Sequence, residues 1–338
     1  MYQFARKALF KLDPEKAHVL ALNSIRYAEK FKLSPHMVEQ LSLPVSVMGL
    51  EFSNPVGLAA GLDKNGDCID GFAALGFGFI EIGTVTPRPQ PGNAKPRLFR
   101  LAEDGALINR MGFNNHGVDH LVRKVKEARY EGVIGINIGK NFDTPVDKAV
   151  YDYLNCLRKV YPHAGYIVIN ISSPNTPGLR ELQHGKYLKQ LLDALKAEQL
   201  TLSQKHGKYV PLVFKVAPDL DDDEINEMAG QFLAAKLDGL ITTNTTSSRE
   251  GVEASPYAKE AGGLSGVPVY GKALAVQEKF YKLLGDDIPL IGVGGISNGE
   301  QGAERMSKGA KLLQLYTGFI FSGPDLIAEV VKGIKQAQ

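Results

Sequence analysis

Eight short apolar runs, each rich in β-branched residues, constrain the fold of this chain more than any other feature. The runs are apolar on both faces, which is typical of buried parallel strands. Stretches with the spacing of amphipathic helices lie between them. The runs cover residues 54–61, 77–85, 132–139, 165–172, 212–218, 239–245, 289–295 and 312–318, and examples of the helical stretches cover residues 118–130, 186–206, 222–235, 272–284 and 324–334.

This alternation of strands and helices predicts a closed (β/α)8 TIM barrel of the α/β class. The length of 338 residues and the 44% apolar content suit one such barrel with a large core. An open, doubly wound sheet is the alternative that the pattern leaves open. Insertions at 86–117 and 246–270 and a polar segment at 173–185 follow the second, sixth and fourth runs. All three follow strand carboxyl ends, where barrel enzymes place their catalytic groups.

The first 44 residues do not fit this repeat and predict a small N-terminal helical extension. Asp13 and Pro14 have the residue types of an N-cap and a first helical position. A helix follows them, and Pro35 opens a third short turn. One face of the segment before Asp13 carries the apolar residues Phe4, Ala8, Leu9 and Leu12.

A small hairpin is predicted between this extension and the first strand. Residues 45–48 and 50–52 flank Gly49 and would cap the floor of the barrel. We therefore divide the chain into a helical domain at 1–44 and a barrel domain at 45–338.

Charge and cysteine content exclude several classes of protein. Lys and Arg number 39 against 37 Asp and Glu, and the net charge of +2 argues against a nucleic-acid binder that relies on bulk charge. Cys68 and Cys156 are too few for a disulfide framework or a four-thiolate zinc site, and they suit a reducing cytoplasm. Arg6, Lys7 and Lys11 interrupt the apolar N-terminus, so we expect no secretory signal and a protein kept inside the cell.

Polar residues end most of the predicted strands. Asn and Lys are poor strand formers and are costly to bury unpaired, so Lys215 within the run 212–218 needs a buried partner or a bound anion. A satisfied core polar group explains one such residue. The same feature at one end of seven strands indicates a polar ligand there, and the residues concerned include Lys64, Thr84, Asn137, Asn170, Lys215, Asn244 and Thr317.

The turn at Gly294 and Gly295 falls on the seventh strand, where barrels bind phosphate through backbone N–H groups. Its spacing does not match a dinucleotide fingerprint. His116 and His120 are four residues apart, but no Glu follows His116, and we predict no metal site.

Four amides reach the same predicted edge from separate segments. Asn109, Asn170, Asn175 and Asn244 present both donors and acceptors, which suits a planar ring of alternating N–H and C=O groups. Ser173 precedes a proline on a tight turn, and a helix cap or turn serine is the alternative interpretation of it.

Five long motifs resemble the class 2 dihydroorotate dehydrogenases, and the resemblance extends over essentially the whole chain. It implies bound FMN, oxidation of dihydroorotate to orotate in pyrimidine synthesis, and a membrane quinone as the final electron acceptor. It also implies that the N-terminal helices form the quinone-entry domain on the membrane surface, at the cytoplasmic side of the inner membrane, in a peripheral and monomeric protein. The motifs lie at residues 57–64, 81–87, 109–115, 170–176 and 292–296.

The resemblance assigns roles residue by residue. Ser173 matches the catalytic base, where the soluble class has a cysteine, and Lys64 lies between substrate and flavin. The substrate positions are Lys64, Asn109, Arg110, Met111, Gly112, Phe113, Asn170, Asn175, Asn244 and Thr245. The flavin positions are Ala60, Gly61, Leu62, Asp63, Lys64, Thr84, Asn137, Asn170, Lys215, Thr243, Gly266, Gly295, Tyr316 and Thr317.

Three rival functions stay open at this point. A lyase or aldolase barrel would use Lys215 as a Schiff base, and its purified form would be colourless. A 2-hydroxy-acid oxidase with FMN would need a catalytic histidine, and no histidine lies at a predicted strand end. A non-catalytic membrane module would leave the polar strand ends unexplained.

Overall fold

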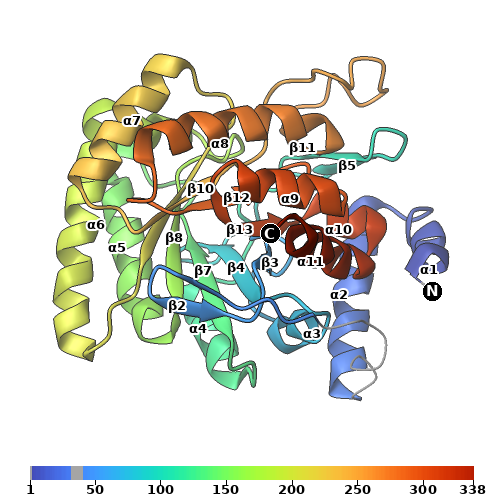
Figure 1. Cartoon of the computed structure of the whole chain (residues 1–338), viewed down its shortest axis with the longest axis horizontal. Helices are drawn as coiled ribbons and strands as arrows, with labels where there is room; N and C mark the ends of the chain where they lie inside the picture. The colour runs from blue at the N-terminus through green and yellow to red at the C-terminus, as the bar shows by residue number, and fades with distance from the viewer. Residues whose placement is uncertain (1, 32–40) are drawn as a thin grey trace.

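The computed structural model describes residues 2–31 and 41–338 and contains a closed barrel of eight parallel strands (Figure 1). Around the barrel the strands follow the order β10-β12-β13-β3-β4-β7-β8-β9. Closure of the sheet confirms the predicted TIM barrel and excludes the open sheet. The strands are β3 (Val56–Leu58), β4 (Phe79–Val85), β7 (Val133–Ile138), β8 (Tyr166–Asn170), β9 (Leu212–Val216), β10 (Gly239–Thr242), β12 (Leu290–Val293) and β13 (Ala310–Leu315).

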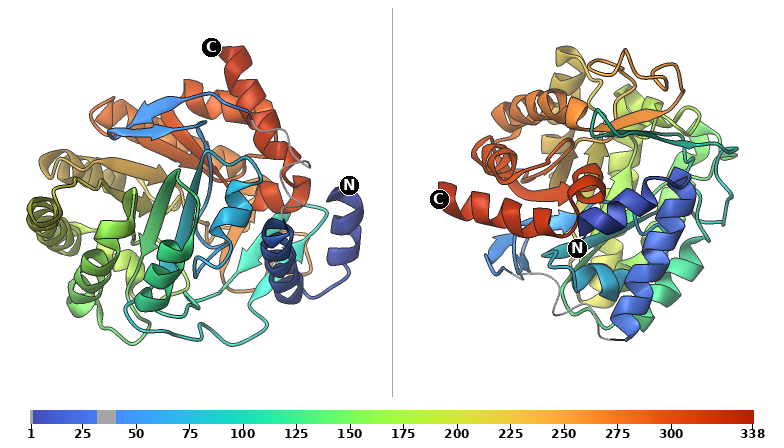
Figure 2. Two further views of the ribbon diagram at one scale, coloured as in Figure 1. Left: turned by 90° about the horizontal axis from the view of Figure 1, so that it is seen from below. Right: turned by 90° about the vertical axis from the view of Figure 1, so that its right-hand side faces the viewer.

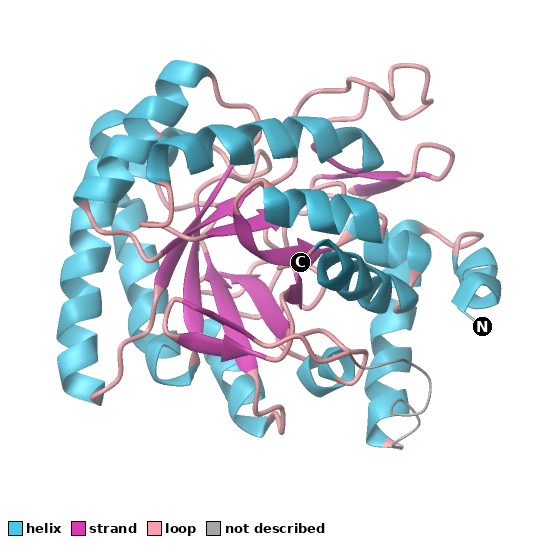
Figure 3. Cartoon of the chain, viewed as in Figure 1, coloured by secondary structure: helices cyan, strands magenta, loops and turns pink. Residues whose placement is uncertain are grey.

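Helices cover the outside of this barrel (Figure 3). Asp221 caps helix α7 in a capping box with Glu224. The helices are α3 (Ile69–Ala73), α4 (Val118–Glu127), α5 (Ala149–Val160), α6 (Gly185–His206), α7 (Asp222–Ala234), α8 (Tyr270–Leu284), α9 (Gly299–Ser307), α10 (Thr317–Ser322) and α11 (Asp325–Ala337), with short 3₁₀ turns at Val146–Lys148, Tyr161–His163, Leu179–Gln183 and Val267–Val269.

The predicted hairpin under the barrel floor is present. Strands β1 (Val45–Val47) and β2 (Leu50–Phe52) pair antiparallel. Phe52 is buried, and its ring lies 5.2 Å from that of Phe79 on β4, measured between centroids. The hairpin thus closes the end of the barrel opposite the polar strand ends.

The two long insertions meet in a second sheet, which the sequence did not predict. Strands β5 (Leu98–Leu101) and β6 (Ala106–Asn109) come from the first insertion, and β11 (Gly263–Gly266) comes from the second. Gly263 pairs with Asn109 and Gly266 with Ala106 across the antiparallel β11–β6 ladder. This sheet brings Asn109 and Gly266 to the carboxyl end of the barrel.

The N-terminal extension consists of α1 (Tyr2–Leu9) and α2 (Pro14–Lys30), and Asp13 caps α2 as predicted. Figure 2 shows both helices on one side of the barrel, with α1 beside the C-terminal helices. Tyr2 donates a 2.5 Å hydrogen bond to the Ile320 carbonyl, and Arg6 donates a 2.8 Å bond to that of Phe321.

The third turn predicted at Pro35 lies outside the described residues. Within the described part of the chain, no helix combines the length and the apolar character that crossing a bilayer requires.

Candidate active site

A cavity of about 1050 Å³, its open mouth included, lies at the carboxyl ends of the barrel strands. Barrel strands, the loops that follow them and the second sheet all contribute to its wall. Most of the site residues predicted from the sequence line it, namely Ala60, Gly61, Lys64, Thr84, Asn109, Met111, Gly112, Phe113, Asn170, Ser173, Asn175, Lys215, Thr243, Asn244, Thr245, Gly266, Gly295, Tyr316 and Thr317.

Four predicted residues do not line the cavity. Leu62 is buried beside it. Asp63 is buried and accepts backbone hydrogen bonds from Asp67 at 2.9 Å and Cys68 at 2.8 Å, so it closes the loop after β3. Arg110 turns away to Glu260, to which it donates a 2.6 Å hydrogen bond.

Asn137, the fourth of these residues, lies behind the cavity wall. It accepts a 2.6 Å hydrogen bond from the Thr84 hydroxyl and one of 3.2 Å from the Asn170 amide. Its own amide donates to the buried Glu81 carboxylate at 2.9 Å. Asn137 therefore orients two residues that do line the cavity.

Lys215 places a buried cation in the cavity wall. No hydrogen bond joins its ammonium to another described residue, although the nearby Glu81 carboxylate attracts it. Burial lowers the pKa of Lys215, and the negative charge of Glu81 opposes that shift. A buried ammonium without a hydrogen-bonded partner is costly, so this position favours a bound anion or polar acceptor.

Lys64 is the second cation of the cavity. Its ammonium donates a 2.6 Å hydrogen bond to the Gly61 carbonyl. Burial, and then the positive charge of Arg97, lower the pKa of Lys64 to about 8. At neutral pH the Lys64 ammonium is therefore charged in most molecules of the protein.

The four predicted asparagines meet at the cavity. The Asn244 amide donates to Asn170 Oδ1 at 3.4 Å and to the Ser172 hydroxyl at 2.9 Å, and the Asn175 amide donates to the Asn109 carbonyl at 3.1 Å. Because these bonds hold the amides in fixed orientations, the cavity wall presents a defined pattern of donors and acceptors.

Ser173 lines the cavity and is buried, with 6% of its surface exposed. Its hydroxyl accepts a 3.3 Å hydrogen bond from the Asn175 backbone N–H. Close to it in the chain, the buried hydroxyl of Thr176 has no hydrogen-bond partner among the described residues. A hydroxyl in that state is free to bind a water molecule or a ligand.

Comparison with known proteins identifies the family, because residues 42–337 match the family described as Dihydroorotate dehydrogenase. The chain belongs to the dihydroorotate dehydrogenase family. It is 59% identical over 335 residues to the "Dihydroorotate dehydrogenase (quinone)" of Ectopseudomonas mendocina, which covers 99% of this chain and 98% of that protein. The protein of the same name from Pseudomonas aeruginosa is 58% identical over 335 residues, with the same coverage. These matches confirm the resemblance to class 2 and make the chain an enzyme of this type.

Solved structures of the family share the fold. The crystal structure of DHODH from Eimeria tenella in complex with ferulenol matches with a TM-score of 0.85 and 36% identity, over 93% of this chain and 90% of that one. The ligand-free Eimeria tenella structure matches with a TM-score of 0.85 and 38% identity, over 93% of each chain.

Several lining residues of this family member were not among the predicted site residues. Gln314 interrupts the apolar run 312–318, and that polar position could have revealed it. Ser265 had no such signal, because its place depends on the pairing of β11 with β6. The lining residues missed in this way are Ala59, Ser265, Val269, Val293, Ile296, Gln314, Leu315 and Gly318.

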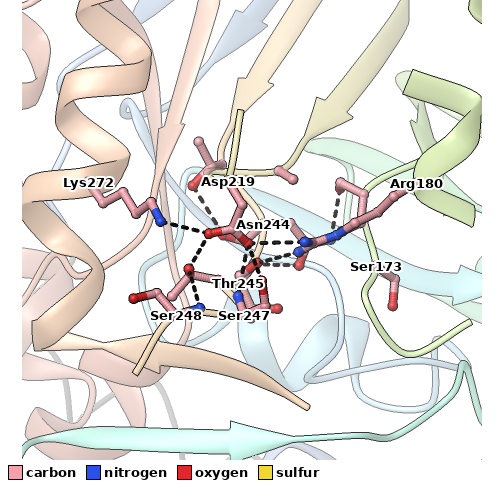
Figure 4. Close-up of polar contacts among 12 residues, drawn as sticks. Ser173, Arg180, Asp219, Asn244, Thr245, Ser247, Ser248 and Lys272 are labelled. Carbon is pink, nitrogen blue, oxygen red and sulfur yellow. Dashed lines mark hydrogen bonds and ion pairs between the residues drawn. The ribbon is translucent and has the colours of Figure 1, made fainter. Parts of the chain in front are cut away.

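A polar cluster around Asp219 lies close to Thr245, which lines the cavity (Figure 4). The carboxylate accepts hydrogen bonds from Lys272 at 2.8 Å, from Arg180 at 3.1 Å, and from the Thr246 hydroxyl. Burial acts to raise the pKa of Asp219, but the bonds from Lys272 and Thr246 outweigh it, and the pKa falls to about 2. The cluster thus stabilises the charged form of the carboxylate.

We expect Asp219 to make folding stability depend on acid pH. Its pKa of about 2 lies below the unfolded value of about 3.9, so its contribution is complete above pH ~5 and is mostly lost at pH ~2; solvent screening of this half-buried carboxyl limits it to at most about 2 kcal/mol. The difference in unfolding free energy between the wild type and Asp219→Asn, measured with urea, should therefore shrink from pH ~5 to pH ~2. A difference independent of pH over this range would contradict the expectation.

Three other side chains bring potential metal ligands together. Asp67, His116 and His120 place ligand atoms within 4.8 Å of one another. The Arg123 guanidinium lies 2.9 Å from His120 Nδ1, and its positive charge opposes a bound cation. That the protein holds no metal stays a prediction.

Proposed function

We propose that the protein oxidises dihydroorotate to orotate in pyrimidine synthesis, with FMN as hydride acceptor and a membrane quinone as the final electron acceptor. One observation carries the proposal. A single cavity collects Ser173, the buried Lys215, the partly buried Lys64 and four hydrogen-bonded asparagines at the carboxyl end of a barrel. The relatives that match the whole chain carry the name of this reaction.

The residues present fit FMN. The cavity is a concave site, open to solvent, whose wall combines glycines and apolar side chains with lysine, amide and hydroxyl groups, the mixture that cofactor sites use. Lys215 supplies a buried positive charge that forms no hydrogen bond with the described residues, and Gly295 and Thr317 line the part of the wall where barrels bind phosphate. When bound, FMN supplies the acceptor for the hydride that leaves C6 of dihydroorotate.

The remaining chemistry belongs to side chains of this protein. The four amides would bind the pyrimidine ring edge, and Lys64 would attract the substrate carboxylate. Ser173 would accept the proton from C5. A serine hydroxyl is a weak base, so Thr176 and Phe113 would help by shaping a small pocket for proton transfer.

The colour of the purified protein tests this proposal. A flavin enzyme is yellow, and dihydroorotate added without oxygen should bleach the yellow absorbance; added quinone should then restore it. A colourless protein that forms a covalent adduct with a keto substrate and borohydride would instead support the lyase alternative through Lys215.

We propose that the N-terminal helices bind the membrane surface peripherally, on the cytoplasmic side of the inner membrane, and that the protein acts as a monomer. The exposed apolar side chains on this extension include Phe4, Leu12 and Leu20, which are 80%, 42% and 48% exposed. Lys7 and Lys11 lie near them in the chain and would meet anionic headgroups. Arg6, in contrast, already bonds the Phe321 carbonyl.

Quinone would reach the flavin past these helices. Glu15 of α2 accepts a 2.7 Å hydrogen bond from Arg97. His18, also on α2, lies near Lys64: burial is the main cause that lowers the pKa of His18 to about 3, and the positive charge of Lys64 is the second. Because Lys64 lines the cavity, α2 lies close to the cavity wall.

Loss of the apolar residues on this face should weaken membrane binding. We expect the triple variant Phe4→Ser, Leu12→Ser and Leu20→Ser to bind anionic lipid vesicles at least about tenfold more weakly, because less apolar surface enters the bilayer. Co-sedimentation with vesicles measures this. Leu200→Ser is the matched control, since Leu200 is 61% exposed on α6. Equal binding by the triple variant and the control would oppose the proposed surface.

A further inference from the structure

Arg180 connects the loops that follow three barrel strands (Figure 4). Its Nε donates to the Ser172 carbonyl at 3.2 Å, in the loop after β8. Its two terminal nitrogens donate to the Asp219 carboxylate at 3.1 Å, after β9, and to the Thr245 carbonyl at 3.2 Å, after β10. These strands are neighbours in the barrel, in the order β8-β9-β10.

Two of the three acceptors adjoin the cavity. Ser172 directly precedes Ser173, and Thr245 itself lines the wall. A hydrogen bond to the Ser172 carbonyl restrains the peptide plane between the two serines, and with it the direction in which the Ser173 side chain points. Arg180 does not line the cavity, so any effect on the reaction must pass through these neighbours.

The chemistry of the guanidinium suits this task. Its donors lie in one rigid plane, so a single side chain can bind three acceptors from different segments, which a lysine ammonium on a flexible stem does less well. Asp219 neutralises the guanidinium, and the backbone N–H of Ser247 donates a 2.9 Å bond to the same carboxylate. Arg180 is thereby held in place while it holds the two carbonyls.

We propose that Arg180 is a positioning residue that keeps Ser173 oriented toward the substrate by fixing the carbonyls of Ser172 and Thr245. The inference rests on the proposed function, which gives Ser173 the proton transfer. Without the guanidinium, both carbonyls lose a donor and the serine loop gains freedom. A displacement of about 1 Å at a reacting group costs on the order of 10²-fold in rate.

The test follows the bleaching of the bound flavin by dihydroorotate in a stopped-flow instrument without oxygen. We expect Arg180→Met to slow the limiting rate by roughly 30- to 100-fold and to change the substrate dissociation constant by less than about threefold, because orientation and not binding is lost. Arg180→Lys should recover only part of the rate, and added guanidinium ion should raise the rate of Arg180→Met.

Lys272→Met is the matched control. Lys272 also bonds Asp219 but makes no hydrogen bond to Ser172 or Thr245. Its rate should stay within about threefold of the wild type. An equal slowing by Lys272→Met and Arg180→Met would show that only the Asp219 cluster matters and would overturn the assignment to Arg180.

A double-mutant cycle decides whether Arg180 acts through Ser173. In a Ser173→Ala background, Arg180→Met should cost no further rate, because the group that it positions is already missing. If the double variant instead shows the product of the two single rate reductions, the proposal is wrong. If Arg180→Met fails to fold, the same cycle is carried out with Arg180→Lys. A wild type that dihydroorotate does not bleach would instead refute the proposed function itself.

Discussion

Replacing Ser173 with alanine is expected to slow the bleaching of the flavin by dihydroorotate by roughly 10²–10⁴-fold, the usual contribution of general-base catalysis. The hydroxyl lies in the cavity wall and is the proposed acceptor of the C5 proton. Flavin content should not change, because Ser173 is not among the residues proposed to hold the cofactor. The measurements are the stopped-flow rate and the ratio of flavin to protein absorbance.

Ser172→Ala is the control for this variant. The Ser172 hydroxyl bonds Asn170 and Asn244, and Ser172 does not line the cavity. Its loss removes two neutral hydrogen bonds worth about 1 kcal/mol each and should slow the reaction by no more than about 30-fold. Near-normal bleaching in Ser173→Ala would remove Ser173 from the mechanism.

Removing residues 1–40 is expected to abolish quinone reduction while bleaching by dihydroorotate survives. The two reactions should separate because the cavity is built almost entirely from the barrel and the second sheet, whereas α1 and α2 are the proposed route of the quinone. Anaerobic bleaching and quinone-dependent recovery of colour, followed in the same sample, measure the two reactions.

The deletion has a structural cost that needs its own control. Arg97 loses its partner Glu15, and the buried Cys68 loses its contact with the Leu22 carbonyl. Glu15→Gln in the full chain shows how much of any change comes from that ion pair alone. Equal loss of both reactions in a deletion variant that still melts cooperatively would contradict a dedicated acceptor domain.

Strands that are buried on both faces could be predicted because the apolar residues that identify each strand follow one another in the sequence. Each of the eight runs overlaps an observed strand, with ends displaced by a few residues, for example Ala310 in place of residue 312 at the start of β13. Lys215 was recognisable for the same reason, since a charged residue within an apolar run has few structural explanations.

Long-range partners were not predictable in this way. The pairing of Gly263 with Asn109 joins two insertions far apart in the chain, and the residues of neither segment identify the other as its partner. In the sequence, Arg180 has no feature that distinguishes it from other polar residues in turns. Only the fold brings Ser172, Asp219 and Thr245 within hydrogen-bond distance of its guanidinium.

By itself, the sequence determined the eight buried strands, the capped N-terminal helix and the edge at which polar groups collect, whereas closure of the strands into a barrel was settled by the structure. Those features follow from residue type and periodicity along a short stretch of chain. Only the tertiary structure decided that Arg110 and Asp63 turn away from the cavity and that Asn137 lies behind it. A side chain near a strand end has several polar neighbours within reach, and the closed barrel determines which of them it meets.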